Sequence, residues 1–124
     1  MGKQTSLLMG AIMGGLAVAI GAFGAHALKP FLLAAGRVET FELAVHYQFY
    51  HALALLATGI AMREVVPKAL HYSSLFFVLG IILFSGSLYT LCFTGVKVLG
   101  AVTPVGGVFF ISGWILLGVG LYKK

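Results

Sequence analysis

Long apolar runs, separated by short polar stretches, dominate this chain. Four of them are long enough to cross a bilayer, which takes about 20 residues in helical form. They lie at about residues 7–28, 43–62, 69–93 and 98–121. Each is apolar around its whole circumference and does not alternate apolar with polar positions as the strands of an outer-membrane barrel do. The pattern therefore predicts four transmembrane helices.

The junction between the first two runs predicts a short extra element. Lys29-Pro30 ends the first run, because proline disfavours helical geometry in the preceding residue and suits the first turn of a new helix. A short apolar segment over residues 30–35 then lies at the membrane interface and is closed by Gly36. We expect a single all-α domain over residues 1–124. It is an antiparallel four-helix transmembrane bundle with a short interfacial segment between helices 1 and 2.

The composition fits a chain solvated by lipid. Of 124 residues, 60% are hydrophobic and only 9% are charged, whereas soluble domains carry about 25% charged residues. The single cysteine, Cys92, cannot form an intrachain disulfide, and no Cys-x-x-Cys pair indicates a thiolate metal site. We therefore expect no metal and no cofactor.

The net charge of +5 is explained by topology better than by nucleic-acid binding, because Lys and Arg stand singly or in pairs at helix ends. Four spans place both termini and the middle loop on one side, with five basic residues: Lys3, Arg63, Lys68, Lys123 and Lys124. The other side has three: Lys29, Arg37 and Lys97. The excess of positive charge predicts a multi-pass inner-membrane protein with cytoplasmic termini.

Small residues form a stripe on the first span. Gly10, Gly14, Gly21 and Gly24 fall within about one third of the helix circumference at 100° per residue. Such stripes allow two helix backbones to approach closely. We expect this one to pack against another helix of the same chain.

Most of the polar chemistry lies on the second run. Glu42 and His46 are four residues apart near its start, where they can pair at the membrane interface. Gln48 and His51 lie deeper, His51 about 10 Å below the start of the membrane segment. Polar groups at this depth need partners inside the bundle and are functional candidates.

Several residues of other spans could be those partners. His26 leaves the membrane on the same side as His46 and His51, and the third span offers Ser85, Ser87 and Tyr89. Two interpretations remain: a structural hydrogen-bond network, or a site that binds a ligand or relays protons. Haem ligation by His26 and His51 is a weaker third option, because no spacing signature supports it.

Four segments together carry a family resemblance. They are Gly21-Ala22-Phe23-Gly24-Ala25-His26-Ala27-Leu28, Tyr47-Gln48-x-x-His51-Ala52-Leu53-Ala54-Leu55, Leu83-Phe84-Ser85-Gly86-Ser87-Leu88-Tyr89 and Thr103-Pro104-Val105-Gly106-Gly107. On these motifs nearly the whole chain resembles the YgdD-like family, also called domain-of-unknown-function family 423 or uncharacterised protein family 0382. One departure is Ala27, where glycine would be common.

The resemblance implies a four-span inner-membrane protein and brings no settled activity. It carries over seven motif residues as a polar network, not as catalytic positions: His26, Gln48, His51, Ser85, Ser87, Tyr89 and Thr103.

Two function classes follow. The first and favoured class is a non-enzymatic structural or accessory protein with a buried polar network. Its partners are membrane lipids and a larger membrane complex or further copies of the chain. The second is a carrier or channel for protons or a small solute that uses His26, Gln48, His51 and Tyr89. A dry, fully bonded core favours the first class, and a water-accessible cavity reaching these residues favours the second.

Overall fold

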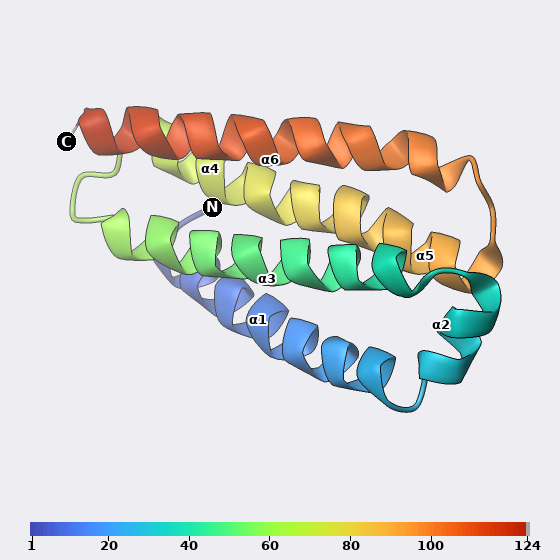
Figure 1. Cartoon of the computed structure of the whole chain (residues 1–124). Helices are drawn as coiled ribbons and strands as arrows, with labels where there is room; N and C mark the ends of the chain where they lie inside the picture. Colours follow the sequence, from blue (N-terminus) through green and yellow to red (C-terminus); the bar gives the residue numbers. More distant parts are fainter. Residues whose placement is uncertain (124) are drawn as a thin grey trace.

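The computed structural model describes residues 1–123, in which all regular secondary structure is helical. Figure 1 shows long helices lying side by side, with a short helix at one end of the bundle. The helices are α1 (Lys3–Ala25), α2 (Lys29–Ala35), α3 (Val38–Ala61), α4 (Lys68–Gly80), the π-helical η1 (Ile81–Ser85), α5 (Gly86–Thr94) and α6 (Leu99–Tyr122). Because α4, η1 and α5 follow one another without a break, they form a single rod.

The predicted segment between the first two long helices is α2. Pro30 lies in its first turn, and Gly36 ends it in the left-handed conformation with φ of 67°. Glycine adopts this conformation without steric cost. The prediction of a short helix or turn from Lys29-Pro30 and Gly36 is confirmed.

Three helical rods are long and apolar enough to cross a membrane: α1, the rod Lys68–Thr94, and α6. The fourth expected span, residues 43–62, corresponds to α3, which ends at Ala61 and is not among these three. The physical reason is that His46, Gln48 and His51 lower the hydropathy of α3. Hydropathy therefore supports three of the four predicted spans.

Glycines set the distance between α6 and the rod beside it. Three glycines of α6, spaced seven residues apart, each lie against a residue of the rod. The three rod residues are also spaced seven apart. Gly106 lies against the backbone of Phe84, Gly113 against the ring of Phe77, and Gly120 against Leu70. In a fourth contact the glycine belongs to the rod: Gly80 lies against the ring of Phe110 in α6. A seven-residue repeat keeps one face of each helix turned toward its neighbour, and the order of the pairs makes the two helices antiparallel.

The same spacing recurs between α1 and α3, where Gly10, Ala17 and Gly24 are buried. A Cβ at Gly10 would lie 2.9 Å from the carbonyl oxygen of Ala52, and one at Gly24 would overlap the ring of Phe41. The predicted stripe thus faces α3, but its members differ. A Cβ at Gly14 would meet the Cβ of Ala52 in α3 at 3.7 Å, an ordinary contact distance, so Gly14 also faces α3 but leaves room for a methyl group.

We predict opposite effects for two alanine substitutions on this stripe. Gly10→Ala should lower the free energy of unfolding by about 1–3 kcal/mol, because its methyl group must displace the backbone of α3. Gly14→Ala has room and should be neutral or stabilising by up to about 1 kcal/mol, since alanine is the better helix former. Unfolding of both variants by denaturing detergent measures this. Equal destabilisation would show that the rotation of α1 differs from the one described.

Candidate functional site

Gln48 of α3 is a junction between three helices. Its side chain is 3% exposed, and its amide nitrogen Nε2 donates a hydrogen bond to the carbonyl oxygen of Met13 in α1, at 2.9 Å. Its Oε1 accepts one from the Tyr89 hydroxyl of α5, at 2.7 Å. The predicted association of Gln48 with Tyr89 is present in the structure.

His51 lies one turn further along α3 and is 4% exposed. Its Nδ1 is 2.7 Å from the carbonyl oxygen of Tyr47, and its Nε2 is 3.0 Å from Nε1 of Trp114 in α6. An indole N–H can only donate, so Nε2 must accept and the proton resides on Nδ1. The neutral ring stacks on Phe110, with centroids 3.6 Å apart and planes 9° apart.

This arrangement leaves neither imidazole nitrogen of His51 free. Protonation would turn the Nε2 acceptor into a donor and break the bond to Trp114. Ligation of a haem iron would also require Nε2 or Nδ1 to give up its present partner. The geometry therefore holds a neutral histidine in a fixed orientation.

The predicted serines and threonine form separate bonds instead of one network. The Ser85 hydroxyl donates to the carbonyl oxygen of Ala44 in α3, at 2.7 Å. Ser87 Oγ and Thr103 Oγ1 are 2.7 Å apart and join α5 to α6. None of these groups is a hydrogen-bond partner of His51 in the described part of the chain.

His26 does not join the others. It is exposed at the end of α1, and its Nδ1 lies 2.9 Å from the carbonyl oxygen of Ala22 in its own helix. The prediction that His51 bonds to another helix is right, but its partner is Trp114 and not Tyr89, Ser85 or His26. The chain turns into α2 directly after α1, which leaves His26 outside the helix contacts.

Several side chains that join helices were not predicted from the sequence. Ser6 donates to Ser74 at 2.7 Å, which links α1 to α4, and Ser73 donates to the carbonyl oxygen of Gly113 in α6 at 2.8 Å. Trp114 is the only tryptophan, and being 48% exposed it looks like an ordinary lipid-facing residue. The pair Ser73-Ser74 within an apolar run could have indicated these bonds, because hydroxyl groups in a membrane span need hydrogen-bond partners.

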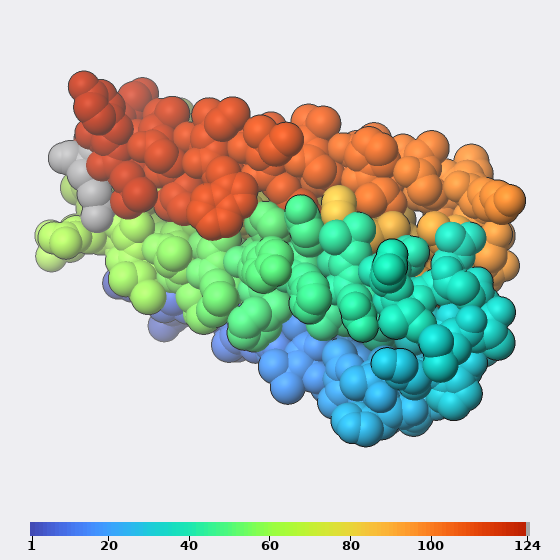
Figure 2. Space-filling model, viewed as in Figure 1, coloured from blue at the N-terminus to red at the C-terminus, as the bar shows by residue number. Residues whose placement is uncertain are grey.

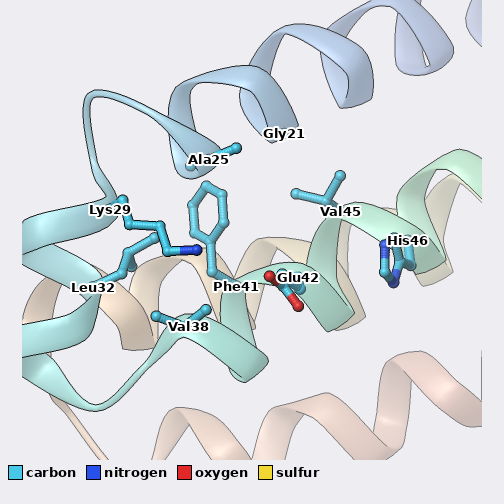
Figure 3. Close-up of a pocket in the computed structure, with 10 residues that line it drawn as sticks. Gly21, Ala25, Lys29, Leu32, Val38, Phe41, Glu42, Val45 and His46 are labelled. Carbon is cyan, nitrogen blue, oxygen red and sulfur yellow. The ribbon is translucent and has the colours of Figure 1, made fainter.

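Glu42 and His46 do not pair. Both are exposed on α3 and line a cavity between α1, α2 and α3 (Figure 3). The His46 ring instead stacks on Tyr50, with centroids 6.1 Å apart. No ion pair between Glu42 and His46 occurs among residues 1–123, so the predicted contact between them is wrong. Both residues nevertheless lie on the exposed surface of the helix, as predicted.

A second hollow lies between α3 and α6, which contact each other little. Figure 2 shows this face, with a few yellow atoms of the intervening rod visible between the two helices. The groove has a volume of about 600 Å³ and is mainly aromatic; its lining includes Tyr47, Tyr50, His51, Phe84, Phe110 and Trp114. His51 thus borders an open groove while both its nitrogens are occupied.

We predict a graded loss of stability at this histidine. His51→Ala should lower the free energy of unfolding by about 1–3 kcal/mol, because the indole N–H loses its partner and the stacked ring is removed. Trp114→Phe removes the donor but keeps a ring, and should cost about 1 kcal/mol. Exposed His26 is the control: His26→Ala should change stability by less than about 0.5 kcal/mol. An equal effect of the two alanine variants in detergent unfolding would contradict the assignment.

Comparison with known proteins identifies the family of this chain. The family described as "Protein of unknown function (DUF423)" matches residues 20–107. A UPF0382 membrane protein of Staphylococcus saprophyticus is 44% identical over 117 residues, covering 94% of this chain and 96% of the relative. The UPF0382 inner membrane protein YgdD of Escherichia coli K12 is 41% identical over 125 residues, covering 99% and 93%.

A third relative, a UPF0382 membrane protein of Staphylococcus aureus, is 42% identical over 117 residues, with 94% of each chain covered. No solved structure matches the chain significantly. Family match, relatives and apolar helices agree: the chain is a helical membrane protein that belongs to the DUF423 family.

Proposed function

We propose that this chain is a four-span inner-membrane protein that acts by helix packing, as a non-enzymatic structural or accessory component of a membrane assembly. The observation that carries the proposal is the state of the buried polar atoms. Within the described residues, every buried side-chain nitrogen or oxygen has a hydrogen-bond partner. Catalysis or transport needs polar groups that are free to meet a substrate, whereas here the buried ones bond to the protein itself.

The position of α3 supports its assignment as the fourth span. Its 24 residues are about 36 Å long at 1.5 Å per residue, enough to cross the hydrocarbon core of about 30 Å. Its polar side chains Gln48 and His51 are buried against neighbouring helices. A helix with polar groups facing protein can span a membrane although its hydropathy is low.

The proposed orientation rests on charge and on the arrangement of the chain ends. Both termini lie toward the end of the bundle that also holds the loop between α3 and α4 (Figure 1). There the amino group of Met1 donates to the carbonyl oxygen of His71, at 2.9 Å. Among the described residues, this end carries four basic side chains, Lys3, Arg63, Lys68 and Lys123, against Lys29, Arg37 and Lys97 at the other end, so we place it in the cytoplasm. Lys124, which the prediction also counted, lies outside the described residues.

The relatives support the location. The E. coli relative is named an inner membrane protein, and those of the staphylococci are named membrane proteins. Little of the present chain lies outside its helices. A partner in an assembly therefore meets helix faces, short loops or bound lipid.

The competing function is a carrier for protons or a small solute. The groove of about 600 Å³ beside His51 is the observation that favours it. Against it, His26 lies apart, and Gln48 and His51 are held by different partners. In the carrier mechanism, His51 must exchange Trp114 for the transported species.

The topology is testable with reporters fused at the C-terminus, at Val65 and at Lys97. We expect cytoplasmic activity for the first two and periplasmic activity for Lys97, because four spans return the chain to the side on which it began. A periplasmic signal at the C-terminus together with a cytoplasmic one at Val65 would mean that the rod Lys68–Thr94 or α6 does not cross. A periplasmic signal at Val65 with a cytoplasmic N-terminus would mean that α3 does not cross, and either result would overturn the four-span assignment.

The choice between assembly component and carrier needs two measurements. On native gels of membranes solubilised in mild detergent, the chain of 13.1 kDa at native abundance should migrate well above the purified monomer in the same detergent. Proteoliposomes holding the purified chain should show no more proton or solute flux than empty vesicles. A monomer on native gels, with flux that His51→Ala abolishes and His26→Ala retains, would establish the carrier instead.

A further inference from the structure

The cavity between α1, α2 and α3 combines charged and apolar walls. Its volume is about 330 Å³, and it lies at the end of the bundle that α2 closes. Phe41, Leu32 and Val45 supply apolar walls, while Lys29, Glu42 and His46 supply polar groups. Figure 3 shows Lys29 extending its ammonium group from α2 toward α3, where the Glu42 carboxylate lies beyond Phe41.

Two side chains of opposite charge at this cavity have no ion-pair partner among the described residues. Lys29 and Glu42 form no ion pair with each other or with another residue in the described part of the chain, and both side chains are exposed. A cation on α2 and an anion on α3 thus stand apart at the rim of one cavity. Two unpaired charges of opposite sign on one cavity suit a ligand that carries an anion and a cation on neighbouring groups.

The cavity continues into an apolar groove along α1 and α3. This groove has a volume of about 240 Å³, shares Gly21, Val45 and His46 with the cavity, and extends past Val18 and Phe49. Val18 lies about two turns before the end of α1, so the groove leads from the helix end toward the middle of the span. A lipid acyl chain is the ligand group that fits such a groove in a membrane helix pair.

We propose that the cavity and groove together bind an aminophospholipid, with a phosphate and a primary ammonium in its head. The phosphate lies at Lys29, the ammonium donates to the Glu42 carboxylate, and one acyl chain lies in the groove past Val18. Charge complementarity selects the head, since hydrogen bonds between charged groups are stronger than neutral ones. This site is independent of the proposed role in an assembly.

Lipids that differ only in their headgroup test the proposal without any substitution in the protein. The purified chain in detergent is titrated with phosphatidylethanolamine, phosphatidylcholine and phosphatidylglycerol of identical acyl chains, and binding is read by native mass spectrometry. Phosphatidylethanolamine should bind about tenfold more tightly than phosphatidylcholine, whose trimethylated nitrogen cannot donate to Glu42. Phosphatidylglycerol, which lacks the cation, should also bind more weakly. Equal binding of the three lipids would overturn the proposal.

Matched variants then locate the site. Glu42→Gln should weaken phosphatidylethanolamine about tenfold and remove its advantage over phosphatidylcholine. Lys29→Gln should weaken all three lipids, because each has a phosphate. The controls are Glu39→Gln, on the same helix, and Lys97→Gln, both exposed and away from the cavity lining. If Glu39→Gln matches Glu42→Gln, binding is a general effect of surface charge and the proposed site is wrong.

A separate measurement tests whether the groove holds an acyl chain. Soluble glycerophosphoethanolamine carries the same phosphodiester anion and ammonium without an acyl chain, and should bind at least a hundredfold more weakly than the intact lipid if the groove holds an acyl chain. Comparable affinity would show that the cavity takes a free phosphate compound and not a lipid. Equal melting temperatures of wild type and variants without lipid check that every variant is folded.

Discussion

Close contact between antiparallel helices through glycine is the interaction on which the rest of this structure depends. In a bilayer the hydrophobic effect does not drive helices together, because lipid tails are as apolar as leucine. Packing must supply the attraction, and glycines at every seventh position of α6 let Phe77 and Leu70 reach its backbone. Gly10 and Gly24 do the same between α1 and α3.

These short distances between helices also decide how the polar groups are satisfied. A serine side chain is short, so Ser73 reaches the carbonyl oxygen of Gly113, and Ser85 that of Ala44, only because the backbones are close. Gln48 similarly spans from Met13 to Tyr89. Hydrogen bonds between helices follow from the packing and then hold its rotation, since a turned helix would leave them unmade in hydrocarbon.

The central place of α3 explains both its polarity and its low hydropathy. It packs between α1 on one side and the α4–η1–α5 rod on the other (Figure 1), so it has two protein-facing sides on which polar residues are tolerated. Its outer end is different, because α1 and α2 leave a cavity there beside Glu42. The same helix thus carries bonded polar groups in the bundle and unpaired charge at its edge.

The sequence by itself determined the helical class, the membrane environment, the short α2 and the glycine stripe of α1, because these depend on local composition and periodicity. It could also identify Gln48 and His51 as buried, from their depth in an apolar run. Only the tertiary structure decided that His51 meets Trp114, that His26 stays outside, and that Gly14 has room. Which side chains meet depends on helix rotation and relative depth, and the π-helical Ile81–Ser85 interrupts the 3.6-residue period from which rotation could be read.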